Sequence, residues 1–92
     1  MLIRALTNGR VSGTGTLAVN SEIIGGVLIT TNGSDAVTVT VQRIDSGGKT
    51  IFSVSTTVPM FAAGPMSLEK SDAAYYSVTG TGGTAQFYEW IN

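Results

Sequence analysis

The chain has 92 residues, contains neither histidine nor cysteine, and carries five basic and six acidic side chains for a net charge of -1. A chain of this length forms one small domain, residues 1–92, that buries about 65% of the surface of its unfolded chain. Disulfides and zinc sites built from Cys or His are excluded, and the scattered basic residues form no stripe for phosphates. We therefore expect no cofactor, no metal and no nucleic-acid partner, with extra stability supplied by oligomerisation.

The amino-terminal segment predicts a strand near residues 2–6. Its apolar run is interrupted by Arg4 and is too short for the core of a signal peptide, so we expect synthesis in the cytoplasm without classical secretion. No stretch approaches the roughly 18 consecutive apolar residues of a transmembrane helix, and a membrane partner is not expected.

Strands are next expected near residues 11–19 and 22–30, and the second of these is apolar on both faces. Its odd positions are Ile23, Val27 and Ile29, and its even positions include Ile24 and Leu28. A strand with two apolar faces needs burial on both sides. A loop or a neighbouring subunit would have to cover the side that does not enter the core.

The clearest alternation lies in residues 36–44, where three valines face one side and polar residues face the other (Val37, Val39, Val41 against Thr38, Thr40, Gln42). This pattern predicts a strand with one buried face. Residues 50–58 repeat it, and the intervening 45–49 contains two glycines, which predicts a hairpin. Similar turn residues at 31–35 and 80–83 predict two further hairpins.

The segment from Pro59 to Pro65 interrupts this rhythm, since each proline lacks a backbone donor. We interpret it as a crossover between two sheets. Strands are then expected near 66–69 and 74–79, with at most one short helical turn between residues 67 and 75. Many short strands joined by glycine-rich turns indicate an all-β fold, a small antiparallel sandwich.

The last strand, residues 84–91, places Phe87 and Ile91 opposite Tyr88 and Trp90. One of these faces can enter the core, and a neighbouring subunit would cover the other. The alternative is that Tyr88 and Trp90 are ordinary amphipathic surface residues. The side chains that we expect in an oligomer interface are Ile23, Ile24, Leu28, Phe87, Tyr88 and Trp90.

The candidate motifs for catalysis in this sequence are incomplete. Gly48-Lys49-Thr50 resembles the end of a phosphate-binding loop, but the required first glycine would fall at Arg43 and a strand follows. The acidic residues occupy turns or strand ends, and a serine nucleophile would lack its usual histidine. We expect no enzyme activity and no catalytic residue. Stacking of a glycan on an aromatic platform stays open as an alternative, and its candidate residues are Tyr75, Tyr76, Tyr88 and Trp90.

The layout of the whole chain resembles the small proteins that decorate or cement the capsids of tailed bacteriophages. The segments that carry the resemblance are a short start at Met1, residues 8–13, residues 23–34, residues 45–52 and residues 78–88. The resemblance implies a jelly-roll-like fold and trimers that clamp neighbouring subunits of the shell.

On this basis we expect a non-enzymatic virion protein that associates with itself as a homotrimer and binds the major capsid protein on the capsid surface. Glycine- and threonine-rich loops or the amino-terminal residues would touch the shell. The alternative is a receptor- or carbohydrate-binding β-sandwich module, such as the head of a fibre.

Overall fold

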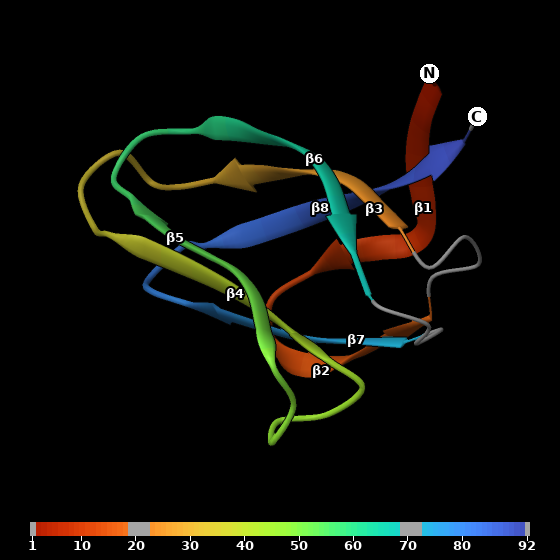
Figure 1. Ribbon diagram of the computed structural model, residues 1–92. Coiled ribbons are helices and arrows are strands. Elements are labelled where there is room, and N and C mark those ends of the chain that lie inside the picture. The colour runs from red at the N-terminus through yellow and green to blue at the C-terminus, as the bar shows by residue number, and fades with distance from the viewer. Residues whose placement is uncertain (1, 19–22, 69–72, 92) are drawn as a thin grey trace.

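The computed structural model describes residues 2–18, 23–68 and 73–91, and in these residues it contains eight strands and no helix. The strands are β1 (Leu2–Val11), β2 (Gly13–Ala18), β3 (Ile23–Thr30), β4 (Val37–Arg43), β5 (Thr50–Thr56), β6 (Met60–Ser67), β7 (Ala73–Thr79) and β8 (Thr84–Ile91). They form a first sheet of order β1-β8-β3-β6 and a second sheet of order β2-β7-β4-β5. The two sheets lie one above the other (Figure 1), which confirms the predicted antiparallel sandwich.

The pairing of the strands is that of one long hairpin rolled into two layers. Along the hairpin β4 pairs with β5, β3 with β6, β2 with β7 and β1 with β8, all antiparallel. Rolling then brings β3 against β8 and β4 against β7. Two four-stranded sheets connected in this order form a jelly roll, the fold that the resemblance implied. The chain ends come together in this arrangement, with Leu2 opposite Ile91 (Figure 1).

Of the three predicted hairpins, the one at residues 45–49 is confirmed, because β4 and β5 pair directly across it. The other two predictions are wrong. Residues 31–35 join β3 to β4, and residues 80–83 join β7 to β8, and each of these connections leads from one sheet to the other. Glycine and asparagine allow the chain to reverse, but they do not decide whether the next strand pairs with the previous one.

The predicted crossover between Pro59 and Pro65 is also wrong for most of its length. Met60–Ser67 is strand β6 at the edge of the first sheet, and the chain passes between the sheets at residues 57–59. The Thr31 hydroxyl donates a hydrogen bond to the Thr57 carbonyl, 2.9 Å away, and so joins this corner to the one at 31–35. Pro65 fits because an edge strand leaves some backbone donors unpaired. The sequence allowed one short helical turn between residues 67 and 75. Residues 69–72 of this range lie outside the described residues, and residues 73–75 belong to β7.

The core lies between the sheets and follows the predicted alternation on β4, where Val37, Val39 and Val41 are fully buried. The buried apolar side chains of the described residues are Leu6, Leu17, Ile24, Val27, Ile29, Val37, Val39, Val41, Met66, Leu68, Ala74, Val78, Ala85 and Phe87. They come from both sheets, which explains why the layers hold together without a disulfide.

On β3 the predicted faces are wrong because the strand contains a bulge. Its register shifts between Ile24 and Gly26 against both neighbouring strands. The extra residue changes the alternation, so Ile24, Val27 and Ile29 share the core while Leu28 points outward. A β-bulge of this kind cannot be located from the period-two pattern alone.

Candidate functional site

The described residues offer little material for catalysis. They contain no group of acidic residues arranged for a metal ion, and no pocket opens on their surface. Asp35 accepts a hydrogen bond from the Asn32 amide and Asp45 accepts one from the Gly47 backbone, so both acids hold turns together. None of the described segments forms a helix long and apolar enough to cross a membrane.

Glu89 is a buried acid with a structural partner. Its side chain is 8% exposed at the end of β8, and its Oε2 atom accepts a hydrogen bond of 2.7 Å from Nε of Arg4. The two residues lie opposite each other in the β1–β8 pair. A buried carboxylate held by a charged donor contributes to strand pairing, and this pairing accounts for Glu89 without a catalytic role.

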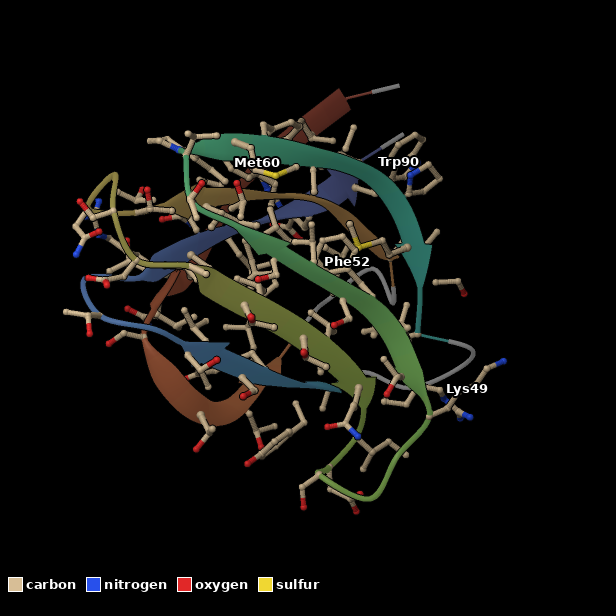
Figure 2. All side chains as sticks on the ribbon, turned by 90° about the vertical axis from the view of Figure 1, so that its left-hand side faces the viewer. Lys49, Phe52, Met60 and Trp90 are labelled. Carbon is tan, nitrogen blue, oxygen red and sulfur yellow. The ribbon has the colours of Figure 1, made fainter. Side chains whose placement is uncertain are left out.

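The outer side of the first sheet is apolar, and we call it the aromatic face, made of Ile3, Leu28, Phe61, Tyr88 and Trp90. The strand register places Ile3 opposite Trp90 and Leu28 opposite Phe61. Phe87 and Glu89 are buried on the inner side of β8. Tyr88 lies between them in the chain and Trp90 follows, so both side chains project outward. Figure 2 shows Trp90 beside the first sheet and away from the second. Leu28 is 38% exposed and Phe61 43% exposed, values high for large apolar side chains.

The rings on this face hold one another in place. The rings of Phe61 and Tyr88 meet edge to face, with centroids 5.6 Å apart and planes at 77°. The Phe61 ring covers Gly26, where any side chain would collide with it. An edge-to-face pair of this kind is favoured by the charge distribution of aromatic rings, and it fixes two rings on the outer side of the sheet. The face is therefore preorganised for contact.

The six expected interface residues fall into two groups. Ile24 and Phe87 are each 1% exposed and belong to the core, so their assignment to an interface is corrected: the fold of a single copy already covers them. Ile23, Tyr88 and Trp90 are half-buried and Leu28 is exposed, which leaves these four accessible.

Sequence reasoning missed Phe61 and Ile3 as members of the aromatic face. Phe61 lies in the segment that we interpreted as a crossover, where no face could be assigned. Ile3 lies in the first predicted strand, and its place opposite Trp90 depends on the pairing of the two chain ends. The position of Phe61 between two prolines was the only sequence feature that could have drawn attention to it, but this position does not reveal which sheet β6 joins.

The outer side of the second sheet is chemically different, since it is lined with hydroxyl groups. Thr38 donates a hydrogen bond of 3.1 Å to Ser55, and the hydroxyls of Thr40 and Ser53 lie 3.2 Å apart. Cross-strand pairs of this kind stabilise the sheet and satisfy one another. The sandwich therefore has one apolar and one hydroxyl-bearing outer face.

Comparison with known proteins found no match to a protein-family model, to a curated protein or to a solved structure.

Proposed function

We propose that the protein is a non-enzymatic structural component of a virion, which associates with itself and decorates and stabilises the outer surface of a bacteriophage capsid. The observation that supports this most is the aromatic face: a folded copy presents an apolar sheet surface with fixed rings. Exposed apolar patches of this kind mark sites of protein–protein contact. The jelly-roll fold agrees with the resemblance to capsid-decorating proteins.

The association joins copies that are already folded. A monomeric protein of this mass is expected to expose about 5,000 Å², and the chain exposes 4842 Å². One copy thus hides as much surface as an ordinary monomer, so the aromatic face is available for assembly rather than required for folding. Each copy then adds a modest contact to the shell, and several linked copies bind together much more tightly than one.

The shell itself is contacted, in this proposal, by the corners at one end of the sandwich. Residues 31–35 and 80–83 meet there, since Gly82 lies beside Asn32 and Gly80 beside Ala36. Most of these corner residues are exposed and small or hydroxyl-bearing. Figure 1 shows these corners at the end of the molecule remote from both chain termini.

The test is retention on capsids. The purified protein is mixed with a panel of tailed-phage capsids stripped of their accessory proteins, and the bound fraction is measured by centrifugation. We expect stoichiometric binding and a higher temperature of capsid disruption. Absence of binding to every capsid would reject the proposal, and a positive signal on a glycan array would then favour the second candidate below.

The second candidate is a carbohydrate-binding module, favoured by the half-buried rings of Tyr88 and Trp90 on the outer face that also carries Phe61. Aromatic side chains of this type present an apolar surface with a polar edge, which suits a sugar ring. Glycan-array binding that disappears in Trp90→Ala, while self-association persists, would favour this function.

A further inference from the structure

We propose that the aromatic face binds the aromatic face of a second copy of the chain, so that two copies form a two-fold symmetric pair by stacking their first sheets. This inference rests on the proposed function, because it names the surface and the symmetry of the self-association. It concerns the described residues of the first sheet.

The charge on the aromatic face allows two copies to approach. Its five members are all uncharged, and the nearby Arg4 directs its Nε to Glu89, whose carboxylate lies on the inner side of the sheet. Arg10 lies opposite Gln86, four residues before Trp90 along β8. Arg10 therefore shares a cross-strand row with Leu28, but it lies on the edge strand β1, so its exposed charge stands at the rim of the contact, where water still reaches it.

The broad side of the molecule is large enough for a stable pair. The molecule measures 36 × 30 × 19 Å along its principal axes, and the shortest dimension suits the thickness of two stacked sheets. A stable complex buries about 800 Å² on each partner, and a broad side of 36 × 30 Å can supply that area. Sheets also stack readily face to face, about 10 Å apart.

The shape of the aromatic face suits packing against the same face of a second copy. The rings of Phe61, Tyr88 and Trp90 protrude, while Ala5 opposite Tyr88 and Ala63 opposite Gly26 are exposed and small. A two-fold contact uses the same patch on both copies, so it needs protrusions and hollows together on one surface. The rings of one copy can then lie against the alanines of the other.

A pair fits the described surface better than a ring of three. A ring is built from two different patches that complement each other on every copy. The remaining large exposed apolar side chains of the described residues are Ile44, in the β4–β5 hairpin, and Val58, at the corner before β6. These two lie apart and form no second apolar face.

The first experiment measures the mass of the full chain by sedimentation equilibrium from micromolar to millimolar concentration. We expect the wild type to approach twice 9.5 kDa. The double variant Leu28→Thr with Phe61→Thr keeps residues suited to strands and should dissociate at least about a hundredfold more readily, because each substitution occurs twice in the pair. Val58→Thr removes an exposed apolar side chain elsewhere and should leave the dissociation constant unchanged.

The second experiment does not depend on the stability of that double variant. The chain has no cysteine, so Leu28→Cys introduces a single reactive thiol on the aromatic face, and Ser55→Cys introduces one on the hydroxyl face. A short bis-maleimide should link Leu28→Cys into dimers and leave Ser55→Cys as monomers. Equal linking of both variants would show that the pair forms elsewhere.

A wild type that remains a monomer, or that sediments as three copies, overturns the pairing. Capsid binding is measured separately and distinguishes the two proposals. A trimer that binds capsids leaves the proposed function standing, and a monomer that binds capsids leaves the decoration standing but rejects the self-association. A pair that binds no capsid leaves the pairing standing and rejects the function.

Discussion

Truncation of Phe87 to alanine tests the placement of the core between the two sheets. Phe87 is the largest fully buried side chain of the described residues, lies opposite Val27 on β3, and has its ring centroid 6.2 Å from that of Tyr76 on β7. Removal of a buried phenylalanine ring costs about 3–5 kcal/mol, from lost burial and from the cavity that remains. A chain of this length has a total stability of about 5–14 kcal/mol, so Phe87→Ala should bring the protein close to unfolding.

The assay is urea denaturation followed by the fluorescence of Trp90, the single tryptophan, at a concentration low enough to keep the chain monomeric. Phe87→Leu should lose clearly less stability than Phe87→Ala because it leaves a smaller cavity. Tyr88→Ala is the matched control: it removes a ring from the neighbouring position on the outer face, where truncation leaves no internal cavity. Its loss should be well below that of Phe87→Ala.

The result that refutes this reasoning is a loss of less than about 1 kcal/mol in Phe87→Ala, a value typical of substitutions outside a packed core. Equal losses in Phe87→Ala and Tyr88→Ala would be as damaging. The first outcome would mean that β8 turns its other face toward the second sheet, and the second would mean that its two faces are packed alike.

Two further predictions concern the backbone and the buried charge. Gly64→Ala should cost at least about 2 kcal/mol in urea denaturation, because a Cβ there would lie closer than 3.0 Å to backbone atoms including the Ile24 carbonyl oxygen. The control Gly47→Ala, whose Cβ would have its nearest neighbour at 3.5 Å, should change stability by less than about 0.5 kcal/mol. Similar losses for both would contradict the close approach of β6 to β3. Arg4→Ala should cost about 1–3 kcal/mol by leaving the Glu89 carboxylate buried without its donor, and Glu89→Gln in the same chain should recover part of that loss. Strictly additive effects in the double-mutant cycle would show that the pair does not interact.

The parts of the fold that sequence reasoning predicted are those fixed by neighbouring residues. The alternation of valine and threonine along β4 determines which side is buried, and the opposition of Phe87 to Tyr88 and Trp90 follows from the geometry of an extended chain. The glycines in 45–49 permit a tight turn between two strands of matching pattern. All three conclusions need only a few consecutive positions.

The parts that failed depend on residues far apart in the chain. Ile24 enters the core because a bulge before Gly26 shifts β3 against β6 and β8, and the pattern of apolar residues fits either alternation. Phe61 reaches the aromatic face because β6 joins the edge of the first sheet, which the prolines around it do not reveal. The candidate surface was therefore only partly visible: Leu28, Tyr88 and Trp90 were expected there, and Ile3 and Phe61 were not.

From sequence alone it follows that the chain is all-β, that the valine side of residues 36–44 is buried, and that histidine and cysteine take no part in its chemistry. Local composition suffices for this, because alternation and turn residues act over a few positions. The folded chain is needed to show which turns are corners between the sheets, and which apolar groups belong to the core or to the outer face. That division depends on pairing between β1 and β8 and between β3 and β6, and strand register over such distances is set by the packing of the whole roll.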